Sequence, residues 1–318
     1  MHKISSGAKK ALELLHAHGY EAYLVGGCVR DMIMGISPHD FDITTSATPN
    51  EMKEVFSDYT IIETGIKHGT ITFLYEKEPV EITTYRIDGE YKDSRHPESV
   101  EFTRRLDFDL SRRDFTMNAL VYNENDGVRD LFGGQEDIKN KVIRAIGDPE
   151  KRFGEDALRI LRGVRFASQL GFKIEEKTKE AMIKCAPLMH NVSPERINVE
   201  LTKLLVGKNV KEALLDNYQI LGEILPEINK MHGFLQHNKY HIYNVLEHTA
   251  IALENIDPVP HLRLTMLLHD AGKPKTFTMD ENGVGHFYGH NAVSAEIAET
   301  FLTKYRYDNA TKEKVIKL

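Results

Sequence analysis

The sequence predicts an α+β domain followed by an all-helical region. Over roughly the first 145 residues, short runs rich in β-branched residues alternate with segments of helical spacing. From Asp148 onward, apolar residues recur at intervals of three and four, and we find no strand pattern. A chain of 318 residues has room for two or three domains. We therefore predict domains over residues 1–147, 148–228 and 229–318.

The elements of the first domain follow in order from local signals. Residues 4–18 carry apolar positions at helical spacing and are followed by a glycine, which predicts a helix. Residues 22–27 (AYLVGG) predict a buried strand that ends in paired glycines. Residues 29–35 predict a helix, and residues 41–49 a strand that a proline ends. Further strands of the same sheet are predicted at residues 60–64, 69–75 and 78–86.

The composition narrows the class of protein. Cys28 and Cys185 are the only cysteines, too few for a disulfide framework, which favours a reducing compartment and hence the cytoplasm. No stretch approaches the roughly 18 apolar residues of a membrane helix, so we expect no membrane attachment. The formal net charge of −7 argues against bulk electrostatic coating of nucleic acid. Contact with RNA is expected to be local, for example over residues 139–165, although their mixed charges are also typical of a solvated helix face.

Two aspartates form the first chemical constellation. Asp40 and Asp42 stand at the start of a predicted strand, where residues i and i+2 point the same way. Two carboxylates aimed at one point can hold Mg²⁺, and two such ions can activate a hydroxyl group and stabilise a leaving pyrophosphate. An Asp-x-Asp pattern alone is usually a surface turn. Here the paired glycines upstream offer backbone amides to phosphates, and Glu81 offers a third carboxylate.

Three longer motifs resemble one known family. Residues 24–49 (LVGGCVRDMIMGISPHDFDITTSATP) resemble the signature of the class II tRNA nucleotidyltransferases and bacterial poly(A) polymerases, within the DNA polymerase β superfamily. Residues 111–120 (SRRDFTMNAL) resemble the family's second motif, and residues 130–172 resemble the join to its neck. The resemblance runs from about residue 20 to 310. It implies an α+β head of DNA polymerase β nucleotidyltransferase type, an all-α neck with a base-recognition motif, and an HD-type body.

The resemblance also implies roles for individual residues. Asp40 and Asp42 would hold Mg²⁺ as catalytic carboxylates, with Glu81 assisting. The other residues would bind the nucleotide: Gly27 and Arg30 at the triphosphate, Arg113, Asp114 and Asn118 at the ribose and triphosphate, and Asp156 and Arg159 at the base, with Glu155 and Arg162 in the same motif.

Asp156 and Arg159 have two competing interpretations. Opposite charges three residues apart commonly stabilise a helix. A carboxylate beside a guanidinium also complements cytosine and adenine, which each present an amine donor beside a ring-nitrogen acceptor. Guanine and uracil present a carbonyl acceptor beside an N–H donor, so both contacts would be repulsive or unsatisfied. On the second interpretation, this pair accepts C and A and rejects G and U.

A segment between the first two motifs bears on which nucleotides are added. Residues 86–102 (RIDGEYKDSRHPESVEF) include Asp93 and Arg95, and one interpretation is a plain surface connection. Family members that add only CC lack a flexible loop here, so the resemblance implies a loop needed for adding the terminal A. This favours CCA or A addition over CC addition.

Histidines and an aspartate form a second constellation. His248, His269 and Asp270, with His290 as a further candidate, resemble the metal site of HD phosphohydrolases. Such ligands suit a divalent transition metal. The pattern normally closes with a later aspartate, which is not evident before Leu318. The chain also stops within a predicted helix. We therefore expect a C-terminal part to be missing, including the tRNA-gripping tail that the resemblance implies.

The expected function is template-independent addition of CMP and AMP, from CTP and ATP, to the 3′ end of tRNA with release of pyrophosphate. The expected partners are the tRNA 3′ end and these nucleotides, and no obligate protein partner is evident. An A-adding enzyme or a poly(A) polymerase is a close alternative, because it shares the head motifs. An HD metal phosphohydrolase is an alternative of a different class. A nucleic-acid-binding module with an inactive head is disfavoured by the intact pair of aspartates.

Overall fold

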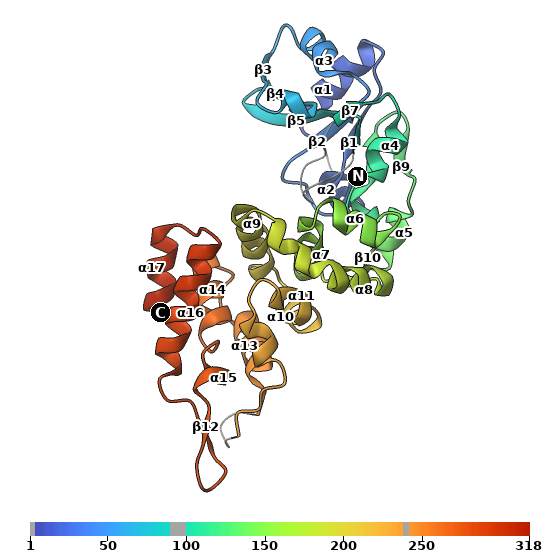
Figure 1. Cartoon of the computed structure of the whole chain (residues 1–318). Coiled ribbons are helices and arrows are strands. Elements are labelled where there is room, and N and C mark those ends of the chain that lie inside the picture. Colours follow the sequence, from blue (N-terminus) through green and yellow to red (C-terminus); the bar gives the residue numbers. More distant parts are fainter. Residues whose placement is uncertain (1–3, 90–99, 238–241) are drawn as a thin grey trace. The chain divides into compact units, whose positions relative to one another are not determined.

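The computed structural model describes residues 4–89, 100–237 and 242–318. The chain divides into two compact units, residues 1–155 and residues 156–318 (Figure 1). The domain boundaries near residues 147 and 228 stay predictions.

A seven-stranded sheet is the centre of the first unit, with strand order β3-β4-β5-β2-β1-β8-β9. Its strands are β1 (Ala22–Val25), β2 (Asp42–Thr45), β3 (Thr60–Ile62), β4 (Thr70–Tyr75), β5 (Glu78–Thr84), β8 (Leu120–Asn123) and β9 (Gly127–Asp130). Strands β2 and β5 pair in parallel, and the other neighbours pair antiparallel. The mixed sheet with helices confirms the predicted α+β class. Parallel pairing places Asp42, the first residue of β2, beside Glu81 in the middle of β5.

Short helices and strands complete the first unit. They are α1 (Ser6–Ala17), α2 (Gly27–Ile33), α3 (Pro49–Val55), α4 (Leu106–Ser111), α5 (Gly134–Lys139), α6 (Pro149–Glu155), the 3₁₀ turns η1 (Ile66–His68) and η2 (Thr116–Asn118), and the strands β6 (Arg86–Asp88), β7 (Val100–Phe102) and β10 (Val142–Ile143). Helix α1 begins at the predicted place, where Ser5 accepts a hydrogen bond from the Ala8 amide. Its face of Ala8, Ala11 and Leu15 is fully buried and packs against β4 and β5. Burial of a leucine side chain contributes about 1.5–3 kcal/mol.

The strand predicted over residues 41–49 is shorter than expected, because β2 ends at Thr45. Thr48 and Glu51 form a capping box, and Pro49 occupies the first turn of α3. A proline suits this position because its missing N–H has no partner within a helix. Pro49 therefore starts a helix rather than only ending a strand.

The second unit consists mainly of helices. They are α7 (Leu158–Leu170), α8 (Glu176–Cys185), α9 (Pro194–Leu205), α10 (Val210–Asp216), α11 (Tyr218–Gly222), α12 (Glu227–Met231), α13 (Val245–Asn255), α14 (Pro260–Leu268), α15 (Lys273–Thr276), α16 (His290–Lys304) and α17 (Asn309–Lys317), with the 3₁₀ turn η3 (Ala186–Asn191). Helix α7 packs against α9 and α10, and α14 packs against α13, α16 and α17. No helix in the described ranges is long and apolar enough to cross a membrane.

Short strands in the second unit correct the expectation that no strands follow Asp148. They are β11 (Lys173–Ile174), β12 (Thr278–Met279) and β13 (Gly285–His286), and the last two pair antiparallel. Each has only two residues, which is too short to show an alternating pattern in sequence. The turn between β12 and β13 is held by Asp280, whose Oδ1 accepts hydrogen bonds from the amides of Asn282 and Val284.

Candidate active site

Acidic side chains from two neighbouring strands approach each other in the first unit. Asp42 is the first residue of β2 and lies in register with Glu81 of β5. The pKa of Asp42 is raised to about 6, first by loss of surrounding water and then by the negative charges of Asp40 and Glu81, while the charge of Arg113 lowers it. Asp42 keeps an exposed surface, so water screens part of this repulsion and a cation can reach the group.

The structure corrects one step of the sequence argument about these acids. Asp40 precedes β2 rather than lying on it, so strand alternation does not align it with Asp42. The charge of Asp40 nevertheless acts on Asp42. Within the described ranges, only the histidine–aspartate cluster below has three ligand atoms within 4.8 Å of one another. Asp40, Asp42 and Glu81 are therefore held as a more open group of charges.

The paired glycines form the turn between β1 and α2. Gly26 has φ +78°, a conformation that strains residues with a side chain, and its amide donates to the Leu120 carbonyl at 3.2 Å. A Cβ atom at Gly26 would lie 3.5 Å from Nη1 of Arg113. Gly27 is the first residue of α2. The turn therefore places the backbone of the paired glycines beside the Arg113 guanidinium.

Three of the predicted nucleotide-binding residues form one buried chain of hydrogen bonds. Nη1 of Arg30 donates to Oδ1 of Asn118 at 2.8 Å, and Nδ2 of Asn118 donates to Oδ1 of Asp114 at 3.1 Å. All three side chains are buried. Arg30 also donates to Oδ1 of Asp31 from Nε at 2.9 Å and from Nη2 at 2.7 Å. Residues 88 positions apart in sequence are thus brought together and held in fixed orientations.

Sequence reasoning missed Asp109, a fully buried carboxylate in α4. It accepts hydrogen bonds from Arg112 (Nη2, 2.7 Å), Arg113 (Nη2, 3.3 Å) and the Thr44 hydroxyl (3.0 Å). Burial raises its pKa, but the charges of Arg112 and Arg113 together with these hydrogen bonds hold the pKa below its usual range. The signal was available in the sequence, because an acid three and four residues before two arginines has the spacing of helical ion pairs.

Asp156 and Arg159 lie at the start of the second unit. Asp156 precedes α7, and its Oδ1 accepts from the Leu158 amide at 3.1 Å. Sequence reasoning missed Arg196 of α9. Its Nη1 donates to Oδ1 of Asp156 at 3.2 Å and its Nη2 donates to Oδ2 at 2.7 Å. Arg159 is buried in α7. The carboxylate of Asp156 therefore accepts a hydrogen bond from the first amide of α7 and is oriented by Arg196.

The other predicted residues of these motifs have separate partners or lie elsewhere. Glu155 ends α6 and pairs with Arg152 at 2.6 Å. Arg162 of α7 lies 3.9 Å from Glu200 of α9. Asp93 and Arg95 lie outside the described residues.

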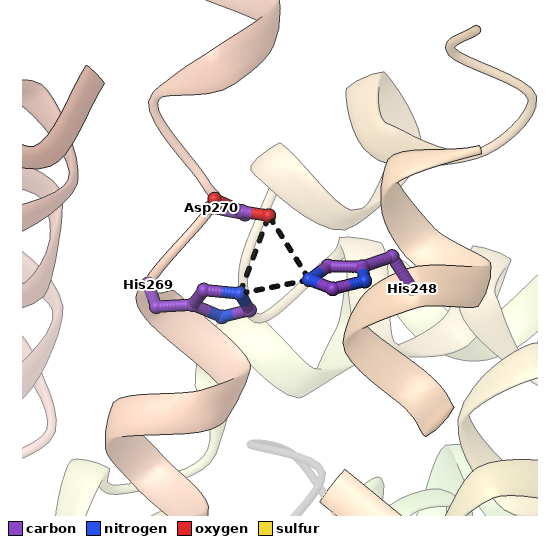
Figure 2. Close-up of side chains that lie close together, drawn as sticks. All are labelled: His248, His269 and Asp270. Atoms are coloured by element: carbon purple, nitrogen blue, oxygen red, sulfur yellow. Dashed lines mark hydrogen bonds and ion pairs between the residues drawn. The ribbon is translucent and has the colours of Figure 1, made fainter. Parts of the chain in front are cut away.

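The structure brings the histidines and the aspartate of the second constellation together. Figure 2 shows His248 of α13 facing His269 and Asp270, which follow α14. Nε2 of His269 lies 3.4 Å from Nε2 of His248 and 3.2 Å from Oδ2 of Asp270, and Nε2 of His248 lies 3.6 Å from the same oxygen. Nε2 of His290 lies 3.6 Å from the other oxygen. The ligand atoms of His248, His269 and Asp270 lie within 4.8 Å of one another, close enough to hold a metal ion.

Neighbouring groups orient the cluster. Nδ1 of His269 donates to the Met266 carbonyl at 2.8 Å, so Nε2 is the ring nitrogen available to a metal ion. Lys273 is buried, and its Nζ lies 2.8 Å from Oδ2 of Asp270 and 2.8 Å from Oε1 of Gln236. Burial raises the pKa of Asp270, but the hydrogen bonds and charges of His269 and Lys273 outweigh it and hold the pKa well below its usual range. A cavity of about 240 Å³ adjoins His269 and His290.

Three family models match successive parts of the chain, in the order of the predicted head, neck and body. The sequence matches the "Poly A polymerase head domain" over residues 22–144, the "Probable RNA and SrmB-binding site of polymerase A" over residues 171–231 and the "HD domain" over residues 239–318. A solved structure, a Bacillus stearothermophilus CCA-adding enzyme in complex with CTP, matches with a TM-score of 0.72 and 33% identity, over 96% of this chain and 67% of that one. The chain belongs to the family of class II tRNA nucleotidyltransferases and poly(A) polymerases.

Curated relatives of the chain agree with that assignment. A CCA-adding enzyme of Lactobacillus helveticus is 51% identical over 206 residues, covering 65% of this chain and 51% of the relative. A CCA-adding enzyme of Oceanobacillus iheyensis is 50% identical over 207 residues, covering 65% and 51%. The chain spans about half the length of the curated relatives it matches. The predicted head, helical neck and HD domain are confirmed, and membership of this nucleotidyltransferase family implies use of a divalent metal.

Proposed function

We propose that the protein adds CMP and AMP, from CTP and ATP, to the 3′ end of tRNA and releases pyrophosphate. The observation that carries this proposal is the meeting of Asp42 and Glu81 across β2 and β5, within reach of the charge of Asp40. The names of the curated relatives and the CTP bound in the related structure supply the choice of reaction and nucleotide.

The three acids fit a divalent cation, and we propose Mg²⁺. Hard cations prefer carboxylate oxygens, and the raised pKa of Asp42 indicates negative charge that a cation would offset. Asp40 and Asp42 would hold the ions, with Glu81 assisting. When bound, such ions favour ionisation of the tRNA 3′-hydroxyl and neutralise charge on the departing pyrophosphate.

The chain's own residues bind and orient the nucleotide. Arg30 and Arg113 place guanidinium groups beside the glycine turn, where Gly27 allows close approach of phosphates. Asn118 and Asp114 are fixed by the hydrogen-bond chain from Arg30 and would contact the ribose and triphosphate. Holding the α-phosphate in line with an incoming hydroxyl lowers the entropic part of the barrier.

Base selection is proposed to rest on Asp156 and Arg159, with Arg162 and Glu155 in the same motif. The two hydrogen bonds from Arg196 orient the Asp156 carboxylate, as an acceptor for an exocyclic amine requires. Arg159 would donate to the adjacent ring nitrogen of cytosine or adenine.

The deciding experiment uses a tRNA that ends before CCA. It would be incubated with Mg²⁺ and labelled CTP or ATP, separately and together, and the product lengths resolved on a gel. Addition of two C residues and one A would support the proposal. Addition of A alone to a tRNA ending in CC would identify an A-adding enzyme, a long A tail a poly(A) polymerase, and no addition would refute nucleotidyl transfer.

A second candidate activity is hydrolysis of phosphate esters at His248, His269 and Asp270. The convergence of these ligand atoms beside a cavity favours it. It is tested by phosphate release from cyclic and linear nucleotides with Mn²⁺, Ni²⁺ or Mg²⁺ added. Release that does not depend on a metal, or that survives His269→Ala, would refute it.

We place the protein in the cytoplasm. Cys28 and Cys185 are both free thiols buried in different units. Burial raises the pKa of Cys28 to about 11, so this thiol stays protonated and unreactive at neutral pH. Buried, unpaired thiols agree with a reducing compartment. Localisation of a tagged chain would test this.

A further inference from the structure

Asp109 connects several elements of the head through one buried carboxylate. Its Oδ1 accepts two hydrogen bonds from Arg112, from Nη2 at 2.7 Å and Nε at 3.1 Å, and a longer one from the Arg86 amide at 3.4 Å. Its Oδ2 accepts from the Thr44 hydroxyl at 3.0 Å and from Nη2 of Arg113 at 3.3 Å. The carboxylate therefore joins α4 to β2, the strand of Asp42, and to β6.

We propose that Asp109 is a positioning residue for nucleotide binding, which holds the Arg113 guanidinium beside the Gly26 turn so that its other donors face the triphosphate. The inference rests on the proposed function. It adds a residue that neither the motif resemblance nor the sequence pattern assigned.

The distribution of hydrogen bonds on Arg113 supports this role. Asp109 holds one nitrogen, Nη2, while Nη1 lies beside the Gly26 turn. Nε of Arg113 is buried without a hydrogen-bond partner among the described residues. A buried donor without a partner is costly, and a phosphate oxygen would satisfy it. Arg113 also lowers the pKa of Asp42, so its charge acts where the metal-bound phosphates are proposed to lie.

The charges are consistent with an anionic ligand. One carboxylate faces two guanidinium groups, so Asp109, Arg112 and Arg113 together carry one net positive charge. Arg112 occupies Oδ1 with two bonds, which leaves Arg113 with a single long bond. Asp109 thus restrains the Arg113 guanidinium through Nη2 and leaves its other N–H groups available to a ligand. A carboxylate that only braced α4 would affect stability and leave nucleotide affinity unchanged.

The test compares Asp109→Asn with Asp107→Asn. Asparagine keeps the shape of aspartate. It has no negative charge, and an NH₂ donor replaces one of the oxygens that accept from the arginines. Asp107 is the matched control, because it is an exposed acid of the same helix that pairs with Arg105. With tRNA lacking CCA, we expect Asp109→Asn to raise KM for CTP about tenfold or more, with a smaller change in kcat, and Asp107→Asn to shift neither by more than about twofold.

A double variant shows whether Asp109 positions Arg113 or only stabilises α4. If Asp109 acts through Arg113, then Asp109→Asn added to Arg113→Ala should raise KM for CTP by less than about twofold further. Additive effects would overturn the inference, as would an unchanged KM in folded Asp109→Asn protein. If that variant does not fold, Thr44→Val removes one bond to Oδ2 and should raise KM for CTP by about threefold. An unchanged KM there would overturn the inference. An inactive wild-type protein would refute the proposed function itself.

Discussion

Asp42 of β2 and Glu81 of β5 lie directly opposite each other across a parallel strand pair, although 38 residues separate them in the chain. Loss of surrounding water, together with the negative charges of Asp40 and Glu81, raises the pKa of Asp42 to about 6. Repulsion between like charges destabilises the free protein and is relieved by a bound cation. The same acids should therefore control activity.

Replacing Asp42 by alanine should abolish nucleotide addition while the fold remains. A lost metal ligand removes several kcal/mol of transition-state stabilisation, so turnover should fall by roughly a thousandfold or more. The rate at which labelled AMP is transferred from ATP to a tRNA ending in CC measures the effect, after circular dichroism has checked the fold. Asp58→Ala, an exposed acid of the same unit, is the control and should retain normal turnover. Near-normal turnover by folded Asp42→Ala protein would remove this residue from the metal site.

Replacing Arg159 by alanine should relax the choice of base. If Arg159 and Asp156 read the base, the contacts that exclude UTP and GTP disappear with the favourable ones. A buried hydrogen-bond mismatch is worth about 1–3 kcal/mol, so selectivity should fall by roughly one to two orders of magnitude. If the pair only stabilises a helix, stability should change by a few tenths of a kcal/mol and selectivity not at all.

The measurement is incorporation of all four nucleotides by Arg159→Ala and Asp156→Ala, with helicity checked by circular dichroism. Asp156→Ala also removes the hydrogen bonds that Asp156 accepts from Arg196 and from the Leu158 amide, so a loss of stability is expected for it in addition. Arg165→Ala is the control on the same helix, because its guanidinium pairs with Glu200 at 2.6 Å. Unchanged preference for CTP and ATP in both folded variants would restore the helix-stabilising interpretation.

Metal binding at the second constellation should depend on His269. Its Nε2 lies near both His248 and Asp270, so His269→Ala should weaken Mn²⁺ binding by about tenfold or more. Calorimetry gives the affinity, and His190→Ala, an exposed histidine paired with Glu223, is the control. Mn²⁺ affinity that is the same in His269→Ala and wild-type protein would show that this ligand set is misassigned.

Glu51 should make the stability of the head depend on pH. Its hydrogen bond from Arg104 lowers its pKa from the ordinary 4.5 to about 2, with bonds from Thr48 assisting. A lowered folded-state pKa contributes stability above about pH 4.5, and this contribution is lost as the pH falls toward 2. Glu51→Gln should therefore cost about 1 kcal/mol at pH 7 and progressively less below pH 4.5. Denaturant unfolding at several pH values measures this, with Glu54→Gln of the same helix as control, and a constant difference would contradict it.

Local sequence determined much of the fold and the identity of the reactive groups. Helix α1, strand β1 and the paired glycines of the following turn were predictable, because helical spacing, a short apolar run and the need for φ +78° at Gly26 are properties of neighbouring residues. Asp40, Asp42 and the histidines were also recognisable from residue type and spacing. The end of β2 and the two-residue strands were not, because few residues carry their pattern.

Only the tertiary structure decided which charges meet. Glu81 faces Asp42 because β5 pairs in parallel with β2, and local periodicity does not specify which strands become neighbours. Arg196 holds Asp156 from 40 residues away, and Asp109 binds Thr44 from 65 residues away. An ion pair or hydrogen bond forms where packing brings both groups together closely enough to offset their loss of water, so its partners follow from the three-dimensional arrangement rather than from spacing along the chain.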